Sequence, residues 1–396
     1  MQGIFFRKSD YRLNKNIMVS RRDFIFKSML TSAATFAPAA MFSAMSSENI
    51  LGSTPFAAPK NKTSGERYTP GKKYGLGGVA AGSAFHVNSD EQIRQMLEAA
   101  WDSGVRYFDT SPWYGLGLSE RRMGQFLYNK NREEYVLSTK IGRILEPDSD
   151  FEMPDGIWKG KLNFNYKYDY TAEGVRKSVE DSLHRMGLPY LDIVFIHDLS
   201  PDNEDMGENW TTYFEEARKG AMPELTKMRE EGLIKAWGFG VNRIEPILRT
   251  MEVADPDIFL SATRYSLIEH EEALNKLFPA CEKNDVSLVM GAPLNSGFLA
   301  GHDRYNYSND IPQAFMEKRD KLCEIAKSHQ VELRSAALQF CAAPAVAASV
   351  IPGASTAEQA AANVASMSEN IPADFWKELK AEGLIASNAP VPEEKK

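Results

Sequence analysis

Short apolar runs recur along the chain from Lys72 onward, and each is bounded by glycine, proline or charged residues. Runs of this length that are rich in β-branched and aromatic residues are typical of buried strands. The pattern predicts eight strands, at Lys73–Ala80, Val105–Phe108, Tyr135–Thr139, Asp192–Ile196, Ile234–Phe239, Ile258–Ala262, Val286–Met290 and Ala348–Ile351.

Segments with helical spacing of apolar residues lie between these runs, such as Asp90–Ser103, Thr171–Met186, Glu271–Asn284 and Gln313–Ser328. Eight strands that alternate with helices favour a closed parallel (β/α)8 barrel over an open doubly wound sheet. The Gly75–Gly78 run lacks the full spacing of a dinucleotide fingerprint, so we interpret it as the entry to the first strand. In a barrel of this type the active site lies at the carboxyl ends of the strands.

Polar side chains follow three of the predicted strands. Asp109 comes after Val105–Phe108, and Tyr114 lies five residues later in a loop rich in glycine and proline. Lys140 and His197 directly follow the third and fourth strands. Each of them alone has an ordinary structural interpretation, such as a loop cap, a solvated strand end or a core histidine. Their shared position in a repeating β/α array instead favours a common catalytic site.

With these four residues in this order, the chain resembles the aldo-keto reductase family of (β/α)8 barrels, over roughly 72–384. The resemblance implies a catalytic tetrad of Asp109, Tyr114, Lys140 and His197. A free phenol has a pKa of about 10, and a nearby ammonium lowers it, which is the role expected of Lys140. Asp109 would hold Lys140 in place, and His197 would donate a hydrogen bond to the substrate oxygen.

The resemblance also implies a nicotinamide dinucleotide, either NAD or NADP, as cofactor. Ser349–Met367 resembles the family's last strand, loop and helix, which receive the adenosine end. Gly291–Gly301 resembles the loop that folds over the pyrophosphate, with Leu299 covering the ligand, and Tyr265 matches the aromatic that stacks on the nicotinamide. The implied cofactor-binding residues are Asn242, Tyr265, Pro293, Leu294, Gly297, Leu299, Gly301, Ile351, Gly353, Gln359 and Asn363.

The chain departs from the family pattern at several of these positions. Ala262 stands where many members have Gln, and Val241-Asn242 stands where they have Ser-Asn. At the adenosine end this motif offers Gly353, Ala354 and Gln359, with no arginine or lysine. Because recognition of a 2′-phosphate normally relies on basic side chains, the motif predicts a preference for NAD over NADP.

Two long segments, 143–170 and 199–220, are rich in aromatic residues and are expected on the catalytic face. Long loops in a compact barrel tend to bind ligands, although covering the barrel top as plain core is an equally open interpretation. We predict that Trp113, Trp158 and His197 contact the substrate.

Four stretches narrow the resemblance: RYSLIE, LNSGFLAG, DYTAEGV and IPADFWKELKAEGLI. They resemble the subgroup similar to D-threo-aldose and L-fucose dehydrogenases, which oxidise the anomeric carbon of a free sugar to a lactone. The resemblance therefore implies an NAD(P)-dependent aldose dehydrogenase. Oxidation or reduction of another aldehyde, such as pyridoxal, stays open, as does a cofactor-bound redox-sensing subunit with little turnover.

Length, charge and cysteine content limit the number of domains and argue against several other classes of protein. A chain of 396 residues with 43% hydrophobic content forms one large domain or two medium ones. A formal charge of −8 and the lack of a basic stripe in the sequence argue against nucleic acid as a partner. The cysteines Cys281, Cys323 and Cys341 show no metal or disulfide spacing, so we expect small buried side chains and no metal site. The oligomeric state is left open.

The first residues have a different character. Ser20-Arg21-Arg22-Asp23-Phe24-Ile25 precedes a weakly apolar, alanine-rich run, which resembles a twin-arginine export signal. The run is too short and too polar for a confident membrane span. We therefore predict a signal over 1–46, a linker over 47–71, the barrel over 72–388 and a disordered tail over 389–396. The expected partner is the export machinery and the expected location is the periplasm, with a basic tail on a cytoplasmic enzyme as the alternative.

Overall fold

A computed structural model describes residues 67–153 and 156–393 of the chain. The twin-arginine segment therefore lies outside the described residues. Eight parallel strands follow one another in the order β1-β2-β3-β6-β7-β8-β9-β10. Their bounds are β1 Leu76–Gly77, β2 Tyr107–Asp109, β3 Val136–Ile141, β6 Ile193–His197, β7 Ala236–Val241, β8 Ile258–Ala262, β9 Ser287–Gly291 and β10 Ala347–Ile351.

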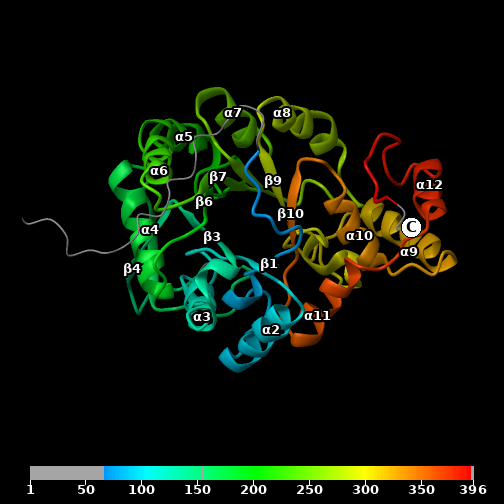
Figure 1. Cartoon of the computed structure of the whole chain (residues 1–396), viewed down its shortest axis with the longest axis horizontal. Helices are drawn as coiled ribbons and strands as arrows, with labels where there is room; N and C mark the ends of the chain where they lie inside the picture. The colour runs from blue at the N-terminus through cyan, green and yellow to red at the C-terminus, as the bar shows by residue number, and fades with distance from the viewer. Residues whose placement is uncertain (1–66, 154–155, 394–396) are drawn as a thin grey trace, which may run out of the picture. The chain divides into compact units, whose positions relative to one another are not determined.

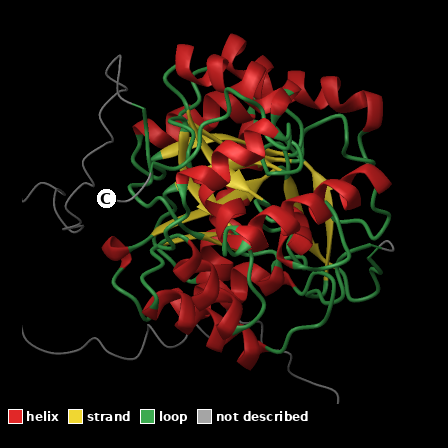
Figure 2. Cartoon of the chain, turned by 90° about the vertical axis from the view of Figure 1, so that its right-hand side faces the viewer, coloured by secondary structure: helices red, strands yellow, loops and turns green. Residues whose placement is uncertain are grey.

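The first and last strands meet through two parallel bridges, Tyr74 with Val350 and Gly77 with Gly353, so that the sheet closes into a barrel. Helices surround the strands on the outside (Figures 1 and 2). They are α2 Asp90–Asp102, α3 Leu118–Leu127, α4 Ala172–Met186, α5 Trp210–Lys219, α6 Ala221–Glu230, α7 Glu245–Val253, α8 Phe278–Lys283, α9 Gln313–Ser328, α10 Leu333–Ala342, α11 Ala357–Ser366 and α12 Ala373–Ala381. The predicted (β/α)8 barrel is confirmed.

The alternation of side chains along the strands divides the apolar residues into two clusters. The inner cluster fills the barrel, with Tyr107, Phe195 and Val289 among its fully buried members. The outer cluster lies between the strands and the helices and includes Phe108 and Trp237. Because neighbouring residues of one strand face opposite sides, both clusters are built from the same short apolar runs.

Two boundaries differ from the sequence-based expectation. Tyr68, expected in the linker, packs against the inner cluster of the barrel. Ala389, expected in a disordered tail, is buried in the outer cluster, and Val391 packs against it. The packed part of the chain therefore extends beyond 72–388 at both ends. Among the cysteines, Cys281 and Cys341 are buried as expected, but Cys323 is exposed.

The predicted elements need three further corrections. The first strand is much shorter than Lys73–Ala80, because the chain turns into a short 3-10 helix at Ala80–Gly82. The helix expected over Glu271–Asn284 contains a π-helical segment, Ala273–Leu277, before α8. The long segment 143–170 contains a two-stranded antiparallel sheet, β4 Arg143–Pro147 paired with β5 Phe164–Tyr168. The sequence of β5, FNYKY, alternates aromatic and polar residues, a strand signal that the sequence analysis did not use.

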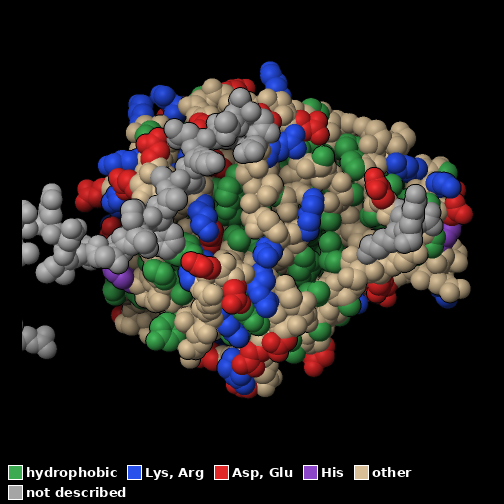
Figure 3. All heavy atoms as spheres, in the orientation of Figure 1, with side chains coloured by type: hydrophobic (Ala, Val, Ile, Leu, Met, Phe, Trp, Pro, Cys, Tyr) green, Lys and Arg blue, Asp and Glu red, His purple; other side chains and the backbone are tan. Residues whose placement is uncertain are grey.

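Basic and acidic side chains are interspersed on the face of the molecule seen in Figure 3. Within the described ranges, no helix is long and apolar enough to cross a membrane. The same residues contain no group of three or more His, Cys, Asp and Glu side chains that could hold a metal ion.

Candidate active site

Strand register brings the four tetrad residues to one end of the barrel. Asp109, the last residue of β2, is paired with Ser138 of β3. Lys140 lies two residues further along β3, and His197 ends the neighbouring strand β6. Tyr114 comes from the turn after β2, where Gly82 approaches so closely that a Cβ there would lie 2.6 Å from the Tyr114 carbonyl carbon. This turn therefore requires glycine at position 82.

Asp109 and Lys140 form a buried ion pair, with the lysine Nζ 2.7 Å from Asp109 Oδ2. The same ammonium donates to the Thr110 carbonyl at 2.8 Å, and Ser138 donates to Asp109 Oδ1 at 2.6 Å. The side chains are 1% and 2% exposed, so neither charge is solvated by bulk water. Burial raises the pKa of the Asp109 carboxyl, against the lowering effect of Lys140 and Ser138.

Tyr114 lies beside this pair, with the Lys140 Nζ 4.5 Å from the centre of the phenol ring. Burial raises the pKa of Tyr114 well above its usual value, and the carboxylates of Asp109 and Asp198 raise it further. The pKa of Tyr114 is therefore raised on balance, and not lowered as expected from Lys140. The physical reason is that Asp109 balances the lysine charge, so that desolvation of the phenolate dominates.

His197 has a defined proton arrangement. Ser111 Oγ lies 3.1 Å from His197 Nδ1 and already accepts the Trp113 backbone N–H, so its own proton is free to be donated to Nδ1. Arg143, which has only donors, is 3.5 Å from the same nitrogen. Nδ1 is therefore the acceptor and Nε2 carries the proton. Burial, together with the charges of Lys140 and Arg143, holds the pKa of His197 well below its usual value, so the ring is neutral.

Two charged residues of this cluster escaped the sequence analysis. Arg143 begins β4 and is 5% exposed; its guanidinium lies 4.4 Å from the Trp113 ring centre. It pairs with Asp198 at 3.1 Å, and Asp198 Oδ1 is 3.5 Å from His197 Nε2. Both residues follow strand ends, as the tetrad does, so position along the strand was an available signal.

A small pocket of about 160 Å³ opens beside Tyr114 and His197. Trp113 and Trp158, predicted to contact substrate, both line it, and the two rings meet edge to face at 6.2 Å. Asp198 and Asn242 supply polar groups, and Tyr307, which the sequence analysis missed, closes another side. The pocket combines aromatic faces with a few hydrogen-bonding groups next to the Tyr114 phenol.

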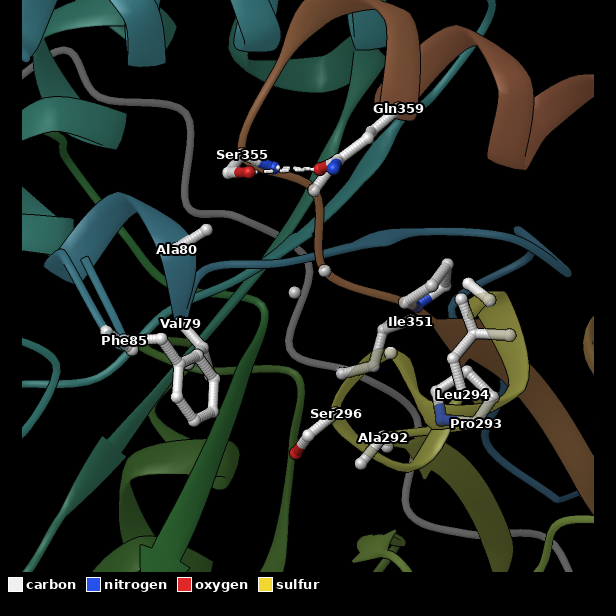
Figure 4. Close-up of a pocket in the computed structure, with 18 of the residues that line it drawn as sticks. Val79, Ala80, Phe85, Ala292, Pro293, Leu294, Ser296, Ile351, Ser355 and Gln359 are labelled. Carbon is white, nitrogen blue, oxygen red and sulfur yellow. Dashed lines mark hydrogen bonds between the residues drawn. The ribbon is translucent and has the colours of Figure 1, made fainter. Parts of the chain in front are cut away.

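A longer cleft of about 300 Å³ begins at Asp109 and Tyr114 and ends at α11. Figure 4 shows Val79, Ala80 and Phe85 on one wall and Ala292, Pro293, Leu294 and Ser296 on the other, with Ser355 and Gln359 at the far end. The walls are mostly small or apolar residues, and a Cβ at Gly353 would meet only the Gly77 carbonyl, at 3.8 Å. An extended ligand can therefore approach the backbone closely here.

The end of this cleft at α11 suits the phosphate of a dinucleotide. Thr356 caps α11, whose first turn faces the cleft through Gln359, and a helix N-terminus favours phosphate. Gln359 accepts the backbone N–H of Ser355 at 2.9 Å and so shapes the loop. The other predicted residues that line this cleft are Pro293, Leu294, Gly297, Ile351, Gly353 and Asn363.

Three predicted cofactor residues do not line either cavity. Tyr265 packs face to face on Phe340, with ring centres 4.8 Å apart, and is buried in the outer cluster. Leu299 is also buried there, because the left-handed backbone at Ser296 and Gly297 turns the chain inward. Gly301 is exposed, in a left-handed cap. Neither cavity brings these three residues to a ligand, so the stacking role of Tyr265, the covering role of Leu299 and cofactor binding by Gly301 stay predictions.

The cleft instead contains basic residues from segments that the motif does not include. Arg304 extends across to Phe85, with its guanidinium 3.9 Å from the ring centre, and donates to the Ser296 carbonyl at 2.8 Å. Arg334, from α10, also lines the cleft, and its Nε donates to Ser366 Oγ of α11 at 3.3 Å. Both residues lie outside the motif that follows the last strand, so no pattern in the sequence indicated that they line the cleft.

Comparison with known proteins agrees with this arrangement of a barrel, a cleft and a polar strand-end cluster. The model of the Aldo/keto reductase family matches residues 73–382. The chain therefore belongs to the aldo/keto reductase family and is an NAD(P)-dependent oxidoreductase.

Two relatives are similar over most of their length. D-threo-aldose 1-dehydrogenase from a Pseudomonas species is 36% identical over 327 residues, which cover 78% of this chain and 94% of the relative. Pyridoxal 4-dehydrogenase from Microbacterium luteolum is 34% identical over 329 residues, with 79% and 94% covered. Among solved structures, the holo form of an aldo-keto reductase from Bacillus halodurans has a TM-score of 0.59 at 22% identity, covering 83% of this chain and 98% of that one, and it supports the fold.

Proposed function

We propose that this protein oxidises an aldose at its anomeric carbon to a lactone, using Asp109, Tyr114, Lys140 and His197. The observation that carries the proposal is that Tyr114 lines both the small pocket and the long cleft, while His197 lines the pocket with its ring centre 5.8 Å from that of Tyr114. A substrate hydroxyl in the pocket would reach both side chains while its carbon faces the cleft. The similarity to D-threo-aldose 1-dehydrogenase supports a sugar as substrate.

The residues divide the proton chemistry between them. When bound in the cleft, a nicotinamide dinucleotide supplies the acceptor for the hydride that leaves the anomeric carbon. Tyr114, as phenolate, takes the proton of the anomeric hydroxyl, and His197 Nε2–H donates to the same oxygen. Lys140 keeps a positive charge 4.5 Å from the phenol ring, while Asp109 and the Thr110 carbonyl fix its position.

The test is to add free sugars with NAD or NADP to the purified protein and to follow the absorbance of the reduced nicotinamide. We expect turnover with at least one aldose, and a lactone as the product in mass spectrometry. Pyridoxal is the comparison substrate, because a relative with a similar identity acts on it. Turnover of pyridoxal alone would replace the sugar proposal. Tight cofactor binding without any turnover would favour a redox-sensing subunit.

For the cofactor, we propose NAD as the preferred form. Gly353 and Ala354 offer no charge to a 2′-phosphate, and Gln359 is engaged with Ser355. Arg334 is the one arginine or lysine among the described residues that line the adenosine end, and its Nε donates to Ser366 Oγ at 3.3 Å. It is therefore the residue that could overturn the preference.

We also propose that the protein is exported through the twin-arginine pathway and leaves the cytoplasm with its dinucleotide bound. Arg21 and Arg22 support export, and a folded route would allow loading before transport. Replacing both by Lys and fractionating cells tests the first part, because we expect the variant to stay in the cytoplasm. Mass spectrometry of protein purified natively from the periplasm tests the second. Protein that arrives without dinucleotide would refute retention but not the barrel chemistry.

A further inference from the structure

The backbone conformation of Asp198 is unusual, and its side chain lines the small pocket. Asp198 directly follows β6 and has a φ of +46°, in the left-handed region that residues other than glycine seldom adopt. Its backbone N–H donates to the Gly240 carbonyl at 3.0 Å, and its carbonyl accepts from Asn203 Nδ2 at 2.9 Å. The unusual backbone is thus held from both sides, and the side chain lines the pocket.

One oxygen of the Asp198 carboxylate is hydrogen-bonded to Arg143, and the other can accept a hydrogen bond from a ligand. Arg143 donates to Oδ2 at 3.1 Å, whereas Oδ1 has only a contact of 3.5 Å with His197 Nε2. The Asp198 side chain is 24% exposed, while Arg143 is 5% exposed. An ionised carboxylate has about four acceptor sites, so several remain for a ligand in the pocket. Asp198 is also the one carboxylate among the described residues that line this pocket.

The position of this oxygen relative to His197 indicates which ligand group it meets. In the proposed reaction, His197 Nε2–H holds the oxygen on the reacting carbon. An acceptor 3.5 Å from that nitrogen lies within reach of an oxygen on the adjacent carbon, because oxygens on neighbouring carbons are about one hydrogen bond apart. Asp198 accepts hydrogen bonds and cannot donate when ionised, so the matching group is a hydroxyl.

We infer that Asp198 is a specificity-determining residue that accepts a hydrogen bond from the hydroxyl next to the reacting carbon, with Arg143 as its positioning residue. The inference rests on the proposed sugar oxidation and names its substrate class: aldoses that carry a free 2-hydroxyl. Arg143 acts at a distance from the substrate, since it holds Oδ2 and also contacts His197 Nδ1 from behind. The guanidinium also lies over the rings of Trp113 and Tyr168, 4.4 and 5.1 Å from their centres, and these cation–π contacts hold it in place.

The experiment compares an aldose with its 2-deoxy analogue in the native enzyme and in Asp198→Asn. This substitution keeps the shape, but Arg143 would take the amide oxygen and leave the amide N–H₂ facing the pocket, so that a donor replaces the acceptor. We expect the ratio of kcat/KM for the aldose to that for the 2-deoxy sugar to fall roughly 10- to 100-fold, as for the loss of a hydrogen bond to a charged group, because any effect on Tyr114 or His197 acts on both sugars alike. Glu204→Gln removes the same charge from an exposed position on the same loop and is the matched control, with both substrates unaffected.

Folding of each variant is checked by its affinity for the dinucleotide, which should not change. Arg143→Met should also reduce the preference for the aldose over the 2-deoxy sugar, and Arg143→Lys should restore part of it, because lysine keeps a charge but not the planar fork. If Asp198→Asn lowers kcat/KM equally for both sugars, the inference is wrong and the proposed oxidation stands. If the native enzyme turns over no aldose, both the proposed oxidation and the inference on Asp198 are wrong. An unchanged preference in Arg143→Met overturns the positioning role.

Discussion

The two ends of the long cleft are built in different ways. At the reacting end, Asp109, Lys140 and His197 sit on neighbouring strands, and each is almost fully buried with hydrogen-bond partners within the barrel. At the adenosine end, the lining comes from a loop and from two helices, through Ser355, Gln359 and Arg334. We therefore expect the strand ends to carry the chemistry, and segments that are distant in sequence to recognise the ligand. Changes at the first end should stop the reaction, and changes at the second should alter the choice of ligand.

The largest effect is expected for Tyr114→Phe. The variant keeps the ring beneath Lys140 but removes the atom that takes or gives the proton, so turnover should fall roughly 10²- to 10⁴-fold. Dinucleotide affinity, measured by titration of protein fluorescence, should stay the same. Tyr128→Phe, at a ring that is 69% exposed, is the control and should be fully active. Near-native turnover of Tyr114→Phe would remove the tetrad assignment.

Lys140→Met tests whether the ion pair at the reacting end also stabilises the fold. The substitution leaves the buried Asp109 carboxylate without its counter-charge, which should lower the free energy of unfolding by about 3–5 kcal/mol in urea denaturation. Adding Asp109→Asn should recover much of that stability, because no uncompensated charge is then buried. Activity should remain low in both variants. If Lys140→Met is as stable as the native protein, the buried ion pair between Asp109 and Lys140 has no role in stability.

The pH dependence should differ between the two directions of the reaction. The raised pKa of Tyr114 means that the phenolate fraction grows about tenfold per pH unit below that pKa, so kcat/KM for oxidation should rise with pH through the neutral range. Reduction uses the neutral phenol and should be flat there. Because the pKa of His197 lies well below its usual value, neither curve should show a step near pH 6.5. Such a step in the reductive profile would show that His197 is protonated.

The smallest effect is expected at the adenosine end. Arg334→Gln should weaken NADP binding by up to about tenfold and leave NAD binding unchanged, whereas Gln359→Arg should favour NADP. Arg121→Gln, on the outside of α3, is the control for loss of an arginine. If the native protein binds NADP tighter and Arg334→Gln abolishes that advantage, the preference proposed for NAD is refuted.

The amino-acid sequence alone was sufficient for the barrel and for the placement of Asp109, Lys140 and His197 at neighbouring strand ends. Apolar runs separated by helical patterns define the strands locally, and the residue after a strand must lie at the carboxyl edge of a parallel barrel. Trp113 and Trp158 line the small pocket, as the sequence analysis expected of aromatic residues in loops at that edge. These inferences depend on local periodicity and on one topological rule.

Side-chain direction and long-range proximity depended on the tertiary structure. Tyr265 and Leu299 lie in the segments after β8 and β9, yet their side chains are buried in the outer cluster. Arg143, Asp198, Arg304 and Arg334 reach the site through backbone turns and through contacts with residues far away in the chain. The pKa of Tyr114 was misjudged for the same reason, since desolvation and the pairing of Lys140 with Asp109 exist only after the strands have closed around them. Periodicity places a residue along the chain, whereas burial and charge balance arise from the whole fold.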